Sequence, residues 1–208
     1  MSEHKIRIEL YRDKSIDELS KILSNPDEKP DTGTAAAAVA AIGAAFLCRS
    51  AALASRVPAE RSDSEKDRLD WLVRNSEILR SYMVKLADED VRCRGPLRKA
   101  LKEGDERTIE AARQTAVSIC AEVIHMAGAG LDIAMELGSY ADAEIAALLR
   151  ESAVLILAAA ECCVPHILYM AGYSSDDTYI YVTRRENELN LTELRNKHSQ
   201  LLEILSGR

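Results

Sequence analysis

The sequence is poor in aromatic residues, and this scarcity limits which residues can form the core and which folds the chain can adopt. Aromatic residues make up only 4% of the 208 residues, with a single Trp and a single Phe. Alanine and leucine must therefore supply most of the core. Because alanine is the best helix former and lets helices approach closely, we predict an all-α fold. The expected architecture is a single-domain bundle of about five to seven helices with a long central Ala/Gly-rich helix, with residues 1–208 forming one domain.

Basic residues are not in excess either, since the net charge is -7 and the pI is about 5.2. Non-specific binding to nucleic acid needs a basic face, so we expect no nucleic-acid partner, although a few arginines could still hold a small anion. The five cysteines include no C-x-x-C pair, and residues 1–14 are polar and charged, unlike a secretory signal. Reduced thiols in a cytoplasm fit this pattern best.

Metal-site and nucleotide-site patterns are absent as well. The chain has only four histidines and contains neither H-E-x-x-H nor G-x-x-x-x-G-K-[ST]. Cys163 and His166 are three residues apart on an expected helix, but two ligands do not make a closed zinc site. We interpret these two residues, together with Cys162, as core packing. We therefore expect no metal and no cofactor.

The longest uncharged stretch covers residues 32–48 and is rich in alanine, with Gly43 inside it. A bilayer span needs about 20 predominantly apolar residues, and this stretch is shorter and only weakly apolar. We therefore predict a buried helix over residues 34–57 and no membrane partner.

Helix-start signals and apolar periodicity place the remaining elements. Two S-x-x-E capping boxes, at residues 15–18 and 62–65, predict helix starts. The Gly95-Pro96 pair predicts a break in the second long helix, and the alternation over residues 179–183 predicts an extended connector. The expected helices cover residues 15–24, 34–57, 64–91, 107–137, 141–170 and 191–205.

Two groups of carboxylates are candidates for chemistry. Residues 88–90 form the acidic triplet Asp-Glu-Asp at the end of an amphipathic pattern, and Asp142 opens a helix that is otherwise mostly apolar. The triplet could simply be a solvated helix face. Asp142 could simply be a carboxylate that stabilises a helix N-terminus. Both interpretations stay open at this point.

Four segments in a fixed order resemble the formimidoyltetrahydrofolate cyclodeaminase / methenyltetrahydrofolate cyclohydrolase family. They are a proline loop, an Ala/Gly-rich helix, a long charged helix that ends in acids, and a later Asp-Ala-x-x-Ala-Ala-Leu-Leu helix start. The resemblance covers residues 15–185, and it depends on the order of the four segments. The family's Pro-Gly-Gly-Gly-Ser loop matches residues 30–34, where Gly33 is kept and Thr34 replaces the serine. Its small-residue helix matches residues 35–47.

The charged segments match less completely. The family's D-x-E-A-F segment matches residues 90–94, where Asp90 is kept and arginine stands at 92 and 94. Arg92 and Arg94 thus replace the second acid and the aromatic residue. The lysine-rich G-K-K-K-Y segment matches residues 58–62, where Arg61 alone keeps a positive charge.

The helix start S-D-A-G-V-A-A-L matches residues 141–148, with Asp142 kept. The resemblance implies a homodimer and a tetrahydrofolate derivative as substrate. Asp90 and Asp142 are then the implied catalytic carboxylates, and Gly33, Thr34 and three arginines, at 61, 92 and 94, are the implied substrate-binding residues.

The implied function is that of a one-carbon folate enzyme, a cyclohydrolase or cyclodeaminase acting on methenyl- or formimidoyl-tetrahydrofolate without a cofactor. The departures keep an alternative open. A triple-glycine turn lets backbone N–H groups approach a ligand closely, and Asp31 and Thr32 add side chains there. The alternative is a catalytically eroded family member that binds folate or another small anion.

Overall fold

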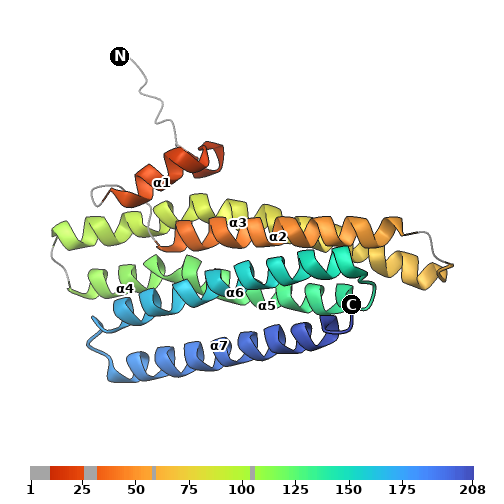
Figure 1. Cartoon of the computed structure of the whole chain (residues 1–208). Helices are drawn as coiled ribbons and strands as arrows, with labels where there is room; N and C mark the ends of the chain where they lie inside the picture. Colours follow the sequence, from red (N-terminus) through yellow and green to blue (C-terminus); the bar gives the residue numbers. More distant parts are fainter. Residues whose placement is uncertain (1–9, 26–31, 58–59, 104–105) are drawn as a thin grey trace, which may run out of the picture.

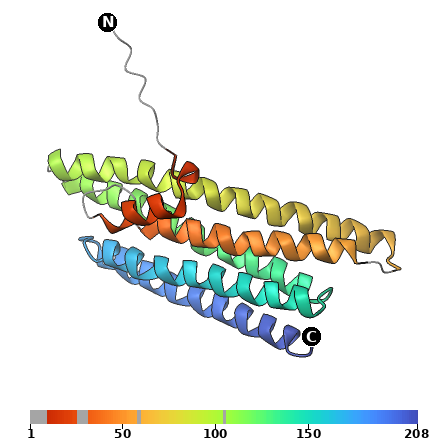
Figure 2. The same ribbon diagram turned by 45° about the horizontal axis from the view of Figure 1, so that its top comes forward.

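The computed structural model describes residues 10–25, 32–57, 60–103 and 106–208, and these residues are helical almost throughout. In Figures 1 and 2 the long helices lie side by side in layers, with α2 and α3 on one side, α4, α5 and α6 in the middle and α7 on the other side. The described residues contain no strand, which confirms the all-α prediction. The elements are η1 (Tyr11–Asp13), α1 (Ile16–Ser24), α2 (Thr32–Arg56), α3 (Asp63–Glu103), α4 (Glu106–Ala116), α5 (Ser118–Gly138), α6 (Ala143–Ala171) and α7 (Asp177–Leu205).

Helix α2 packs against α3, α5 and α6, and its small residues explain how closely it does so. A Cβ atom added at Gly43 would lie 2.9 Å from Cγ1 of Ile156 and 3.1 Å from Cβ of Leu155, so only glycine fits. The Ser152 hydroxyl donates to the Gly43 carbonyl oxygen at 2.8 Å across the same contact. The two helices are therefore locked in an antiparallel pair, in which the start of α2 lies near the end of α6.

Several predicted boundaries are wrong. Residues 179–183 are helical, because Asp176 caps α7 by accepting hydrogen bonds from the amides of Thr178 and Tyr179. Helix α3 continues past Pro96, since Leu97 and Ala100 beyond it are buried against α4. The helix predicted over residues 107–137 is two helices, which meet at Val117.

The prediction that the uncharged stretch is too short for a membrane span is also wrong. Helix α2 has 25 residues, and it is one of three segments long and apolar enough to cross a bilayer by length and composition; the others are Glu106–Gly138 and Ala143–Ala171. Half of the most apolar part of α2 is buried inside the bundle. Its apolar character is therefore used at least in part for helix packing.

Helix α1 differs from the others because none of its residues is buried. It begins with the predicted capping box, in which Ser15 and Glu18 bond each other's backbone amides. Its Ile16 side chain is 83% exposed. In Figures 1 and 2 this helix lies outside the bundle, beside the end of the molecule where α2 starts.

Candidate functional site

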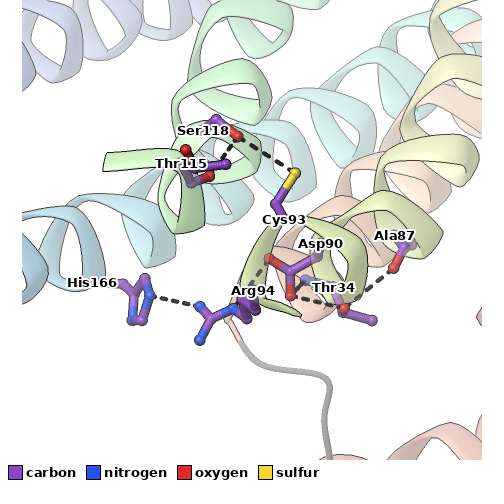
Figure 3. A network of polar contacts seen from close by, with 8 residues as sticks. All are labelled: Thr34, Ala87, Asp90, Cys93, Arg94, Thr115, Ser118 and His166. Carbon is purple, nitrogen blue, oxygen red and sulfur yellow. Dashed lines mark hydrogen bonds and ion pairs between the residues drawn. The ribbon is translucent and has the colours of Figure 1, made fainter. Parts of the chain in front are cut away.

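The candidate site forms where the start of α2 meets the middle of α3. Asp90 accepts hydrogen bonds at its Oδ2 atom from the Thr34 amide at 3.1 Å and from the Thr34 hydroxyl at 3.0 Å. The same hydroxyl lies 3.2 Å from the Ala87 carbonyl oxygen. Figure 3 shows this carboxylate directed at the first turn of α2. A helix N-terminus carries unpaired N–H groups and a partial positive charge, so it stabilises a carboxylate there.

Gly33 is the residue that lets the carboxylate come so close. A Cβ atom added at Gly33 would overlap the Asp90 carboxylate, since it would lie only 2.7 Å from Cγ. Asp90 is 0% exposed. The glycine that the sequence keeps from the triple-glycine loop is therefore the one that the packing of Asp90 requires.

We predict that Gly33→Ala destabilises the protein although alanine is the better helix former. The new methyl group must displace the buried carboxylate, and overpacking of this kind costs about 1–3 kcal/mol. Gly128→Ala in α5 is the matched control, because a Cβ atom there meets only ordinary contacts at 3.7 and 4.0 Å. That control should gain stability from helix propensity. Urea unfolding measures both variants, and equal stabilisation of the two would contradict the packing argument.

Arg94 extends the network from Asp90 to α6. Its Nε atom lies 3.4 Å from Oδ1 of Asp90, and its Nη2 atom lies 2.6 Å from Nε2 of His166. A guanidinium group only donates, so Nε2 of His166 is the acceptor in this contact. The Arg94 side chain is 12% exposed. Sequence reasoning placed His166 in the core; the structure places it, half-buried, at the outer end of this network.

Two cysteine side chains, Cys93 and Cys163, lie near the network. Cys93 lies 3.6 Å from the hydroxyl of Ser118, which also donates to the carbonyl oxygen of Thr115 (Figure 3). Cys163 is buried, and its hydrogen bond with Cys120, together with burial, raises the pKa of the Cys163 thiol far above its usual range. The Cys163 thiol therefore stays protonated and acts as a small core residue, as the sequence predicted, whereas Cys162 beside it is exposed, so the core-packing prediction for Cys162 is wrong.

The other arginine of this segment is placed differently. Arg92 is exposed and pairs with Glu89 one turn before it, at 3.1 Å. It has no contact with Asp90 that the structure records. The structure therefore brings Gly33, Thr34, Asp90 and Arg94 together, and leaves Arg92 outside their network.

Asp142 and Arg61 lie at the opposite end of the bundle. Asp142 is exposed and caps α6, accepting from the Ile145 amide at 2.9 Å. The Arg61 guanidinium lies 5.8 Å from the centre of the Tyr140 ring. Asp142 precedes His166 by twenty-four residues along α6, which corresponds to about 36 Å at 1.5 Å per residue. Within one chain, the two candidate carboxylates do not share a site.

The acidic triplet is not a solvated face. Asp88 is buried and accepts hydrogen bonds from the amides of Tyr11 at 2.6 Å and Arg12 at 3.2 Å, and it forms an ion pair with the Arg12 side chain. Asp88 thus fixes η1 onto α3, two residues before Asp90. Only Glu89 of the three remains partly accessible.

An open groove lies at the same end of the bundle as the network. It has a volume of about 630 Å³ and lies between α4 and the turn that follows α6, where Arg107, Arg113 and Tyr173 line it. Arg113 is held in place by a hydrogen bond of 2.8 Å to the Tyr173 carbonyl oxygen and lies over the Tyr173 ring. In the described part of the chain, no three His, Cys, Asp or Glu residues are grouped to hold a metal ion.

Comparison with known proteins identifies a family and a shared fold. Residues 15–188 match the formiminotransferase-cyclodeaminase family. The solved structure of formiminotetrahydrofolate cyclodeaminase from Thermotoga maritima has the same fold, with a TM-score of 0.83. That match covers 94% of this chain and 97% of the other, with 19% identical residues. No curated protein sequence matches the chain.

Proposed function

The chain belongs to the formiminotransferase-cyclodeaminase family, whose match covers residues 15–188, and from this premise we propose that it is a one-carbon folate enzyme. The substrate is methenyl- or formimidoyl-tetrahydrofolate, and the reaction is that of a cyclohydrolase or a cyclodeaminase. The observation that carries the proposal is the contact of Asp90 with Gly33 and Thr34. It joins two segments that the family resemblance had marked independently, fifty-six residues apart.

Both reactions exchange a group at an amidine-like carbon that bridges N5 and N10. In the cyclohydrolase reaction, water adds to the methenyl carbon and a ring nitrogen leaves with a proton. In the cyclodeaminase reaction, N10 attacks the formimino carbon and ammonia leaves. Each needs one group to take a proton and one to return it, and neither needs a metal or a redox cofactor. Carboxylates stabilise the cationic carbon that both reactions share.

The contacts of the network suggest a division of roles. Asp90 is buried and bonded on both oxygens, so it is a positioning residue that fixes the start of α2 and the guanidinium of Arg94. Arg94 in turn contacts the Nε2 atom of His166 and so fixes the position of its ring. A neutral imidazole accepts a proton from an attacking water once a substrate group takes its place on Arg94.

The remaining expected binding residues are further from this centre. Arg92 and Glu89 are at the surface of α3, and Arg61 is at the far end of the bundle. In this proposal the groove beside Arg113 and Tyr173 gives room for the part of the substrate that does not react. A catalytic role for Asp142 at this site requires a second copy of the chain.

A homodimer and a cytoplasmic location are parts of the same proposal. Helix α2 packs into the bundle on most sides, but one of its faces is open, and Ile42 on that face is 49% exposed. A long helix of small apolar residues gains stability when this face is covered by another protein surface. We expect no membrane and no nucleic-acid partner.

One observation favours a second candidate function. Arg94 stands where the family resemblance has an aromatic residue, and its charge neutralises the buried Asp90. A site that presents arginine and neutral histidine fits a small anion as well as it fits a cationic carbon. The second candidate is therefore a catalytically eroded family member that binds folate or another small anion.

The deciding experiment follows the absorbance of the methenyl group of methenyl-tetrahydrofolate. The wild-type protein should speed the loss of absorbance, and His166→Gln should slow it by about 10²–10⁴-fold, the usual effect of losing a proton-transfer group. His125→Gln is the matched control, because His125 is exposed on α5 and the structure records no contact between it and Asp90, Arg94 or His166. A thermal-shift titration with the same folate runs in parallel. Stabilisation without turnover supports the binding function. The absence of both stabilisation and turnover refutes both proposals.

A further inference from the structure

The end of α3 and the whole of α4 form a helical hairpin, made of the described residues 97–103 and 106–116, with an apolar cluster of its own. The buried residues of this cluster are Leu97, Ala100, Ala112 and Ala116. Helix α4 packs chiefly against α3 and only slightly against α5 and α6. Met170 of α6 packs against both this cluster and the main core of the bundle. The hairpin is therefore held together more firmly than it is held to the bundle.

The hairpin joins the bundle through two interruptions of regular helix. Pro96 inside α3 has no N–H group to donate to the carbonyl oxygen of Arg92. A Cβ atom added to Gly95 would meet nothing within 4 Å, so no packing fixes the chain at this glycine. At the other end of the hairpin, Val117 separates α4 from α5. Helices bend at such positions, because a missing hydrogen bond and a glycine leave the backbone free to change its angles.

The two interruptions lie side by side in space. Sγ of Cys93 lies 3.6 Å from the hydroxyl oxygen of Ser118, and Figure 3 shows the two side chains next to each other. These residues stand just before the first interruption and just after the second. Neighbouring hinge points define one axis, so the hairpin can turn about them without any change inside it.

Two polar contacts fasten the hairpin to the turn between α6 and α7. The Ser174 hydroxyl donates to Oε1 of Glu110 at 2.7 Å. Nη1 of Arg113 donates to the Tyr173 carbonyl oxygen at 2.8 Å. Water can replace either partner when these contacts break, so their loss costs little, and the apolar cluster inside the hairpin stays intact. The two contacts are therefore suited to act as a latch.

We propose that the hairpin is a lid, which turns as one body about its two hinges and so opens and closes the groove at this end of the bundle. The groove, of about 630 Å³, lies between the hairpin and the turn that the latch joins. Hinges of enzyme lids are a few residues in loops or at helix ends that absorb the change in backbone angles. The helix interruptions at Pro96 and Val117 are of this kind.

The position of the lid relates it to the candidate site. Arg94 directly precedes the first hinge and contacts His166 on α6. Tyr173, which lines the groove, follows His166 by seven residues, about two helical turns. Movement of the lid therefore changes access to the side of α6 that continues from His166. That the lid admits a folate and shields it from water rests on the proposed function; the hinged movement does not.

Distances between spin labels test the movement directly. The background variant replaces the cysteines that are not buried, Cys48, Cys93 and Cys162, with serine. In this background, labels at Lys102→Cys on the lid and Tyr181→Cys on α7, both exposed positions, should show two distances, one for the closed lid and one for the open lid. The labelled chain is refolded with an excess of unlabelled chain, so that only distances within one chain are seen. Labels at His125→Cys and Tyr181→Cys, both on the bundle, are the matched control and should show a single distance.

Weakening the latch should shift the lid toward the open distance. Glu110→Ala removes the acceptor of the Ser174 hydroxyl and leaves a good helix former in α4. It should raise the ratio of open to closed lid about fivefold, the effect of one ordinary hydrogen bond. Glu106→Ala is the matched control, because Glu106 lies one turn earlier on α4 and the structure records no hydrogen bond or ion pair between it and the turn after α6. A single distance that Glu110→Ala leaves unchanged would overturn the inference.

A reversible cross-link separates the lid from the proposed chemistry. Glu110→Cys/Ser174→Cys in the same background is joined by a short bifunctional thiosulfonate reagent, whose bonds a reductant cleaves, and this fastens the lid shut. The cross-linked protein should lose the turnover of methenyl-folate and regain it on cleavage, because the substrate cannot enter a groove that stays closed. Full turnover by the cross-linked protein would overturn the gating role. Two label distances in a wild type without turnover refute the proposed enzyme and leave the hinged lid standing.

Discussion

Asp90→Ala is expected to lower the free energy of unfolding by about 3–5 kcal/mol, the usual loss when one partner of a buried ion pair is removed. Asp90 is fully buried, and alanine would leave the Arg94 guanidinium without its carboxylate and the Thr34 amide and hydroxyl without their acceptor. The start of α2 would lose the negative charge that stabilises its N-terminus. Urea unfolding at one fixed protein concentration measures the effect, because a dimer makes stability depend on concentration.

The matched control replaces both charged partners. Asp90→Asn/Arg94→Leu removes both charges while the asparagine carbonyl oxygen still accepts from Thr34, and replacing a buried ion pair with uncharged groups is often nearly neutral. The double variant should therefore be more stable than Asp90→Ala, even though it carries one more substitution. A loss below about 1 kcal/mol for Asp90→Ala would show that the pair is as weak as an exposed one.

Much of the fold could be predicted from the sequence, because helix signals are local. The capping boxes at Ser15 and Ser62 are both present, and the scarcity of aromatic residues correctly predicts helices packed through alanine. The errors lie where tertiary contacts outweigh a local signal. Pro96 interrupts a hydrogen-bonding pattern but not α3, because buried residues on both sides of it hold the helix in place.

The candidate site could be predicted only in part. The motif order marked Gly33, Thr34 and Asp90, and the structure brings these three together. Sequence order carries no distances, however, so it could not show that Asp142 lies at the other end of the bundle. His166 was missed for a related reason: its partner Arg94 is on another helix, seventy-two residues away. Helical spacing places a residue on a face but does not say what covers that face.

Asp142→Asn is expected to change activity strongly and stability little. Asparagine caps helices about as well as aspartate, and the lost interaction of the charge with the helix dipole is only about 0.3–1 kcal/mol. The substitution keeps the shape of the side chain and removes its negative charge and basicity. If Asp142 of one subunit faces the cationic carbon bound to the other, methenyl-folate hydrolysis should fall by about 10²–10⁴-fold while the melting temperature barely moves.

Asp176→Asn provides the matched control for this separation of activity from stability. Asp176 caps α7 as Asp142 caps α6, with its Oδ1 atom accepting at 2.9 Å from the Thr178 amide, but it neither lines the groove nor belongs to the network of Asp90, Arg94 and His166. Both variants should therefore lose the same small amount of stability, and only Asp142→Asn should lose turnover. Full activity in Asp142→Asn would make Asp142 a helix cap and nothing more. The proton transfers would then fall to groups of a single chain, with His166 as the proposed proton acceptor once a substrate group takes its place on Arg94.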